Sequence, residues 1–106
     1  PFDLAGDDPV RRRKAAAFLA RQEDVAPASP IRQVAGNRVP FLIAYGAADL
    51  PELIPQAKEM AASLRGAGSP VELLELPGRT HFDTHEDCGR RDGAWVAKVR
   101  DALRRA

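Results

Sequence analysis

The hydrophobic pattern of this sequence predicts two β-strands joined by a helix. Residues 41–45 are apolar at every position, which is typical of a strand covered on both faces in a parallel sheet. Residues 53–64 repeat apolar side chains at spacings of three and four, the period of an amphipathic helix. Residues 71–76 predict a second strand, and Pro77 and Gly78 after it indicate that the strand closes there.

This strand, helix and strand form a βαβ unit, whose strands are expected to lie parallel with a right-handed crossover. The carboxyl ends of both strands then open at the same edge of the sheet. Asp49 follows the first strand, and the polar segment from Thr80 to Cys88 follows the second. Open α/β sheets build their ligand sites at this edge, so these residues are candidates for a functional site.

Two further helices are expected outside the βαβ unit. Asp8 and Pro9 predict the start of a helix that ends near Arg21. Its apolar face is predicted to consist of Val10, Ala17 and Phe18. A last helix spans residues 93–105, and residues 24–36 are expected to form a loop. The buried stripe of the last helix is predicted to consist of Trp95, Val99, Ala102 and Leu103.

The predicted sheet is incomplete. An isolated parallel pair leaves both edges open, and residues 41–45 are too apolar for an edge strand. The sequence supplies no convincing third strand. We therefore expect the chain to be the carboxyl-terminal part of a larger α/β domain, or to pair with a second copy that completes the sheet.

Composition places the chain among ordinary folded domains. Its 106 residues predict one domain, and 44% hydrophobic with 29% charged residues is typical of a globular protein. The net charge of +1 gives no overall attraction to nucleic acid or anionic membrane, and no apolar run approaches the roughly 20 residues that span a bilayer. The basic clusters at residues 11–14 and 104–105 are interpreted as solvated helix surface.

A single cysteine, Cys88, cannot form an internal disulfide, which favours a reducing compartment and predicts a cytoplasmic location. A nucleophilic thiol paired with His81 is a conceivable alternative. However, Cys88 lies in a charged segment with no helix amino terminus clearly directed at it. An inert, half-buried thiol is therefore the favoured interpretation.

Asp49 and His81 are the strongest candidates for catalytic residues. A carboxylate can accept a proton from one imidazole nitrogen, which fixes the tautomer and stabilises the imidazolium, while the other nitrogen activates a nucleophile. The two residues are expected to meet across the parallel strands. A capping aspartate and an unrelated surface histidine remain the alternative on spacing alone.

Several motifs at matching separations resemble a known family. Residues 45–52 read Y-G-A-A-D-L-P-E with Gln56 after them, and residues 71–83 read V-E-L-L-E-L-P-G-R-T-H-F-D. These segments resemble the last two strands of α/β-hydrolase-fold esterases, with the kynurenine formamidase and small carboxylesterase branch as the nearest likeness. The segment A-S-P at residues 28–30 and the opening P-F-D-L resemble upstream parts of the same family, so the likeness covers nearly the whole chain.

The resemblance implies that Asp49 is the acid and His81 the base of a Ser-His-Asp triad that cleaves esters or N-formyl amides without a cofactor or metal. Residues 1–36 would be a helix and loop, and residues 37–106 the last two strands of a three-layer αβα domain. Phe82, beside the base, is the aromatic expected to contact the small-molecule substrate.

The nucleophile is missing from the motifs of this chain. The family holds its serine in a G-x-S-x-G turn between a strand and a helix, and no such segment occurs here. Ser29, Ser63 and Ser69 lie in a loop, a helix and a helix-terminating turn, so none is expected on a strained elbow. The resemblance therefore implies that the serine lies upstream.

Two alternatives to the hydrolase hypothesis stay open. His81, Asp83, His85 and Asp87 alternate, and on an extended segment they would line one face as metal-type ligands. The other alternative is a non-catalytic binding or assembly module of hydrolase origin.

Three side chains near these elements also have expected roles. Tyr45 and Trp95 are predicted to belong to the core. Arg79 is interpreted as a solvated loop arginine, with contact to an anionic substrate group as the alternative.

Overall fold

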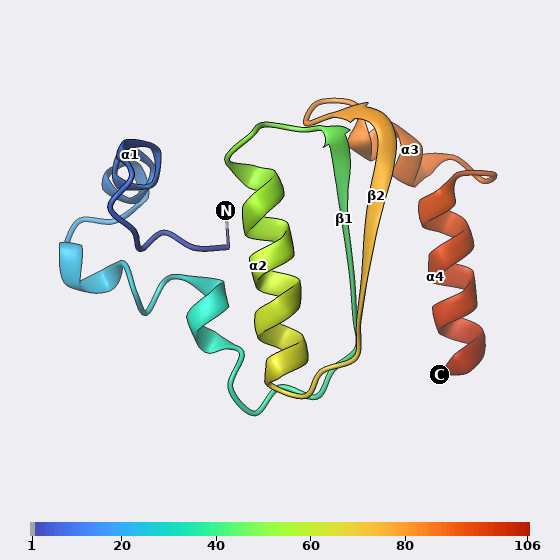
Figure 1. Cartoon of the computed structure of the whole chain (residues 1–106), viewed down its shortest axis with the longest axis horizontal. Coiled ribbons are helices and arrows are strands. Elements are labelled where there is room, and N and C mark those ends of the chain that lie inside the picture. Colours follow the sequence, from blue (N-terminus) through green and yellow to red (C-terminus); the bar gives the residue numbers. More distant parts are fainter. Residues whose placement is uncertain (1) are drawn as a thin grey trace.

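A computed structural model describes residues 2–106, and it has the mixed α/β architecture that the sequence predicts. Its elements, in chain order, are α1 (Pro9–Phe18), the 3₁₀ turns η1 (Gln22–Asp24) and η2 (Pro30–Gln33), β1 (Phe41–Ala48), α2 (Leu53–Gly66), β2 (Val71–Thr80), α3 (Thr84–Gly89) and α4 (Ala94–Arg105). Helix α2 covers one face of the β1-β2 pair and α4 lies against the other, which gives three layers (Figure 1). No helix within residues 2–106 has both the length and the apolar character needed to cross a bilayer.

The two strands are parallel, as expected for a βαβ unit. Their register runs from Phe41 opposite Val71 to Gly46 opposite Leu76. The prediction that Pro77 and Gly78 close the second strand is wrong, because β2 continues to Thr80. The next pair after Gly46 and Leu76 is Ala48 and Thr80, so Pro77 and Gly78 lie in a bulge. Gly78 has φ 69°, a left-handed conformation that glycine adopts without steric cost.

The core lies between the sheet and α2. Alternate residues of β1 point toward the helix, so Ile43 and Tyr45 are buried against the apolar stripe of α2. The buried residues of that stripe are Ala57, Met60, Ala61 and Leu64. The core position of Tyr45 is confirmed, and its hydroxyl donates to Glu75 at 2.9 Å. Burial raises the pKa of the Tyr45 phenol, and the hydrogen bond to Glu75 acts in the same direction.

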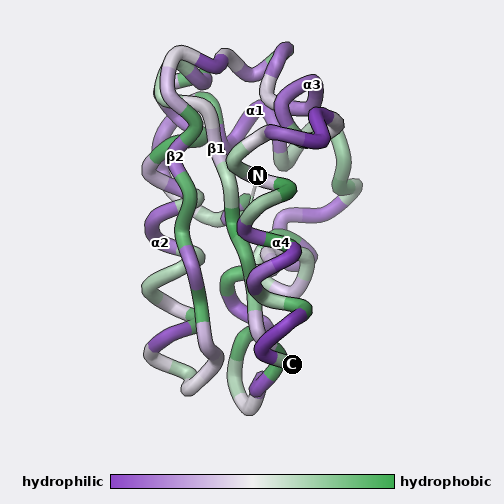
Figure 2. Tube along the Cα trace, turned by 90° about the vertical axis from the view of Figure 1, so that its right-hand side faces the viewer, coloured by the Kyte–Doolittle hydropathy of each residue, from purple (hydrophilic) through white to green (hydrophobic). Residues whose placement is uncertain are grey.

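The other face of the sheet is covered more loosely, and the predicted buried stripe of α4 is wrong. Trp95 and Val99 are half-buried, while Ala102 is exposed and Leu103 is 71% exposed. A two-stranded sheet is too narrow to cover the apolar side of a twelve-residue helix, and an open apolar groove lies between α4 and the strand starts. Apolar and polar positions alternate along α4 in front of the strands (Figure 2).

Glu72 on β2 forms ion pairs with two residues of α4. Its carboxylate pairs with Lys98 at 3.1 Å and with Arg105 at 2.7 Å. These hydrogen bonds, that of Lys98 most of all, hold the pKa of Glu72 below its usual value. Arg105 is 63% exposed, so it lies on the solvated surface as interpreted and also forms an ion pair with Glu72.

Helix α1 begins as predicted and ends earlier. The Asp8 side chain caps it by accepting from the backbone amides of Val10 and Arg11. The helix ends at Phe18 and not near Arg21, and Phe18 is 74% exposed although it was predicted on the apolar face. Ala15 is the buried residue of this helix instead, and Figure 1 shows that α1 lies away from the sheet.

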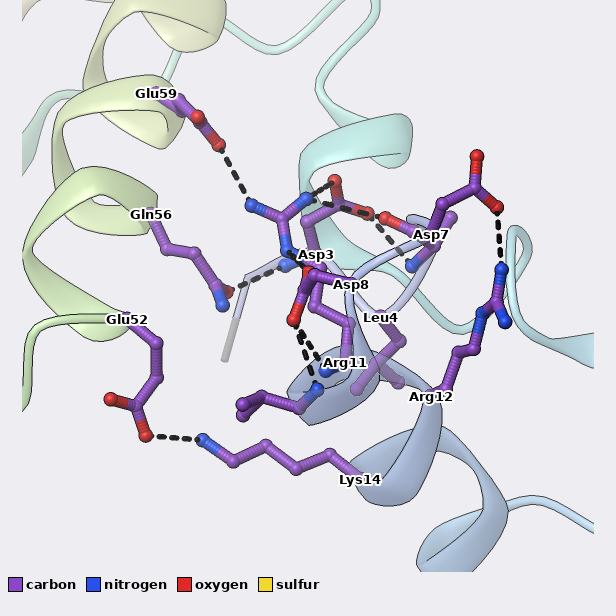
Figure 3. A network of polar contacts seen from close by, with 12 residues as sticks. Asp3, Leu4, Asp7, Asp8, Arg11, Arg12, Lys14, Glu52, Gln56 and Glu59 are labelled. Atoms are coloured by element: carbon purple, nitrogen blue, oxygen red, sulfur yellow. Dashed lines mark hydrogen bonds and ion pairs between the residues drawn. The ribbon is translucent and has the colours of Figure 1, made fainter.

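The basic cluster of α1 is a docking contact and not only solvated surface. Arg11 pairs with Asp3 at 2.8 Å, with Asp8 at 3.1 Å and with Glu59 on α2 at 3.6 Å. A second pair joins α1 to the segment before α2, since Lys14 lies 3.4 Å from Glu52. Figure 3 shows these side chains converging from α1, α2 and the segment before α1.

Two buried polar side chains hold the segment before α1. The side-chain oxygen Oε1 of Gln56 accepts from the backbone amides of Phe2 at 2.8 Å and Asp3 at 3.1 Å. The fully buried Ser29 hydroxyl donates to the Val25 carbonyl at 2.7 Å and accepts from the Leu4 amide at 2.9 Å. Segments far apart in the sequence are thereby joined by satisfied buried polar groups.

Replacing Ser29 with alanine is expected to lower the free energy of unfolding by about 1–3 kcal/mol, because the Val25 carbonyl and the Leu4 amide lose their partner. Urea denaturation followed by circular dichroism measures the loss. Ser63→Ala on α2 is the matched control, and we expect a change of less than about 0.5 kcal/mol there. Equal losses in the two variants would contradict the role assigned to Ser29.

Candidate active site

Asp49 and His81 meet at the carboxyl edge of the sheet. Asp49 directly follows β1, and His81 directly follows β2. The structure places Nδ1 of His81 2.9 Å from Oδ1 of Asp49, which is hydrogen-bonding distance. The parallel topology is the cause, because it delivers two chain segments thirty-two positions apart to one edge.

The environments of the two side chains differ. The Asp49 side chain is 10% exposed and the His81 side chain is 44% exposed. Oδ1 of Asp49 also accepts from the Leu50 amide at 2.6 Å, and the Asp49 amide donates to the Gly46 carbonyl at 3.0 Å. An ionised carboxylate only accepts hydrogen bonds, so Nδ1 of His81 carries the proton and Nε2 is the nitrogen free to act as a base.

Gly46 permits the bulge that precedes His81. A Cβ atom at Gly46 would lie 2.1 Å from the Arg79 carbonyl oxygen and 2.9 Å from Oγ1 of Thr84. Only glycine allows the backbone after the bulge to approach β1 this closely. Sequence reasoning missed this role. A glycine that interrupts an otherwise apolar strand was the available signal.

A short hydrogen-bonded turn carries His81 from β2 into α3. Oδ1 of Asp83 accepts from the Thr80 amide at 2.5 Å and from its hydroxyl at 3.0 Å. The Thr80 amide donation, more than any other contact, holds the pKa of Asp83 below its usual value; the Thr80 hydroxyl and the Arg79 charge act in the same direction. The Thr84 hydroxyl donates to the Thr80 carbonyl at 2.6 Å.

The metal-site alternative required an extended segment, and this premise is wrong. Residues from Thr84 to Gly89 form helix α3, on which positions 85 and 87 point in different directions. Asp83 accepts a hydrogen bond from the Thr80 amide, and Asp87 pairs with Arg79 at 3.2 Å. Within residues 2–106, no group of three or more His, Cys, Asp or Glu side chains is arranged to hold a metal ion.

The surroundings of Cys88 and Arg79 favour structural roles for both side chains. Cys88 is half-buried on α3, and burial together with the Asp87 charge raises the pKa of its thiol. This is opposite to the shift that activates a nucleophilic cysteine. Arg79 is not a solvated loop residue, because it belongs to β2 and its guanidinium pairs with Asp87.

Phe82 is 75% exposed, and its ring stands edge-on to the His81 imidazole with 5.4 Å between the ring centroids. It therefore presents an apolar surface directly beside the His81 imidazole. The buried hydroxyls of Ser29 and Ser69 donate to backbone carbonyls at 2.7 and 3.0 Å, and Ser63 lies within α2. None of the three stands at a strand-to-helix elbow of the kind that activates a serine.

Comparison with known proteins gives one informative match. Over 58 residues the sequence is 43% identical to Esterase LipC of Mycobacterium tuberculosis (strain ATCC 25618 / H37Rv). Part of this chain is similar to an esterase. The match covers 53% of the chain and 14% of the relative's length, so the chain spans a small part of that protein. No family model matches the sequence, and no solved structure matches significantly.

Proposed function

We propose that this chain supplies the acid and the base of a serine hydrolase that cleaves carboxylic esters or N-formyl amides. The observation that carries the proposal is the 2.9 Å hydrogen bond between Oδ1 of Asp49 and Nδ1 of His81. The partial similarity to Esterase LipC supports the same class of reaction. The nucleophilic serine lies in this proposal on a segment upstream of the chain, in a G-x-S-x-G turn.

Each residue has one task in the proposed reaction. The serine oxygen attacks the carbonyl carbon while Nε2 of His81 takes the serine proton. His81 then gives that proton to the departing alcohol or amine, and a water molecule releases the acyl group by the same sequence. Asp49 keeps the imidazole oriented and stabilises its positive charge. Phe82 provides an apolar contact for the substrate beside the base.

The test measures hydrolysis by the complete protein, in which this chain is joined to its upstream segment. We expect turnover of p-nitrophenyl acetate or of an N-formyl aromatic amine, and we expect EDTA to leave the rate unchanged. The chain of 106 residues alone is expected to show no enzymatic turnover, because removing a triad nucleophile costs roughly six orders of magnitude.

The outcomes separate the candidate functions. Hydrolysis of the ester but not of the formamide assigns the complete protein to the esterases, and the reverse assigns it to the formamidases. Activity that EDTA abolishes would contradict a metal-free triad. A complete protein that hydrolyses neither substrate would favour the non-catalytic module.

A further inference from the structure

We propose that Asp83 is a positioning residue, which holds the backbone on either side of His81 so that the imidazole stays hydrogen-bonded to Asp49. The effect on reaction rate rests on the proposed function. The effect on the geometry of His81 does not, because it follows from contacts within the chain.

The first observation is that the carboxylate of Asp83 closes a turn around His81. Its Oδ1 accepts from both donors of Thr80, the residue directly before the histidine, at 2.5 Å for the amide and 3.0 Å for the hydroxyl. The amide of Phe82, the residue directly after the histidine, donates to the Thr80 hydroxyl at 3.2 Å. The carboxylate therefore holds Thr80 directly, and it reaches Phe82 through the Thr80 hydroxyl.

The second observation is that packing alone does not fix His81. Its side chain is 44% exposed, and the neighbouring Phe82 is 75% exposed. The turn also follows directly on the bulged end of β2, where the regular strand pairing has been interrupted. Hydrogen bonds must supply the order that a buried site would obtain from close packing. Those of Asp83 hold Thr80 directly before the histidine, and the Thr84 hydroxyl adds a bond to the Thr80 carbonyl.

The third observation concerns charge. The carboxylate of Asp83 receives two donors, whose hydrogen bonds favour its ionised form, and the charge of Arg79 acts in the same direction. Hydrogen bonds to an ionised acceptor are roughly twice as strong as those between neutral groups. An asparagine at this position keeps the shape but loses the charge, whereas an alanine loses both.

The test uses the complete protein with ¹⁵N-labelled histidine, and the His81 signal is assigned with His81→Gln. The unmodified protein is expected to show an Nδ1 proton that is protected from solvent exchange by Asp49. In Asp83→Ala we expect this protected signal to be lost and kcat for p-nitrophenyl acetate to fall roughly 10- to 100-fold, the scale of a 1 Å misplacement, with KM within about twofold. In Asp83→Asn, both the protected signal and kcat are expected to lie between those of the unmodified protein and of Asp83→Ala.

Matched variants separate positioning from general damage. Glu86→Gln changes an exposed carboxylate on α3, and we expect the signal and the rate to stay unchanged. Thr80→Val removes the hydroxyl that Asp83 and Phe82 share, and a partial loss of the protected signal is expected. It replaces Asp83→Ala as the test if melting curves show that the alanine variant does not fold.

A protected Nδ1 proton and an unchanged kcat in Asp83→Ala would overturn the positioning role. Loss of the protected signal in Asp83→Ala supports the positioning role, whatever the effect of Asp49→Asn on hydrolysis. Unchanged hydrolysis in Asp49→Asn would overturn the proposed function and leave the positioning role intact. The two failures are therefore distinguishable.

Discussion

If Asp49 is the triad acid proposed above, replacing it with asparagine is expected to lower kcat of the complete protein by roughly 10⁴-fold, the scale at which a triad acid contributes. Leu50 and His81 both donate to the same oxygen of Asp49, Oδ1. The amide oxygen of asparagine can receive both donors without rearrangement. The expected loss therefore reports mainly the missing negative charge, which stabilises the imidazolium as His81 takes a proton.

The measurement is the rate of p-nitrophenyl acetate hydrolysis at saturating substrate, together with a thermal melt of each protein. Asp92→Asn is the matched control, because Asp92 is an exposed aspartate that pairs only across the surface with Arg90. We expect the control to retain full activity. A loss of less than tenfold in Asp49→Asn, with the fold intact, would show that Asp49 is not the triad acid.

Adding one methyl group at Gly46 is the second change with a large expected effect. The new Cβ would stand 2.1 Å from the Arg79 carbonyl oxygen, whereas real Cβ contacts are essentially never below 3.0 Å. The backbone two residues before His81 must therefore move by roughly 1 Å. We expect Gly46→Ala to lose about 100-fold in kcat and about 1–3 kcal/mol in unfolding free energy.

Gly66→Ala provides the control for this variant. Gly66 ends α2, and a Cβ there meets nothing within 4 Å. Alanine at this position is expected to stabilise the protein by about 0.5–1 kcal/mol and to leave kcat unchanged. Urea denaturation and ester hydrolysis measure both variants. Normal activity in Gly46→Ala would mean that the bulge does not position the base.

The strand, helix and strand were predictable because their signals are local. The apolar run of β1 and the spacing of three and four in α2 record directly which side chains face the core. The errors arose where burial or structure depends on distant partners. Phe18 and Leu103 lie on apolar faces that the described part of the chain leaves uncovered. Arg11 finds acidic partners that no local pattern indicates.

The candidate site was also predictable only in part. Parallel topology brings the exits of both strands to one edge, so the sequence was sufficient to predict that Asp49 and His81 lie near each other. The contributions of Gly46 and Asp83 were missed, because they depend on the path of the backbone between Leu76 and His81. Pro77 and Gly78 ordinarily mark the end of a strand. Here they lie within β2, because β1 offers the space that Gly46 leaves open.

The bulge in β2 also sets the alignment of Asp49 and His81 along the strands. From Phe41 opposite Val71 to Gly46 opposite Leu76, partners are thirty positions apart in sequence. Continued without interruption, that offset would place His81 level with Pro51, beyond the aspartate. After the bulge the offset becomes thirty-two, as in the pairing of Ala48 with Thr80, and His81 becomes level with Asp49. The two additional residues therefore act as a spacer that determines which residue of the first strand's exit the histidine meets.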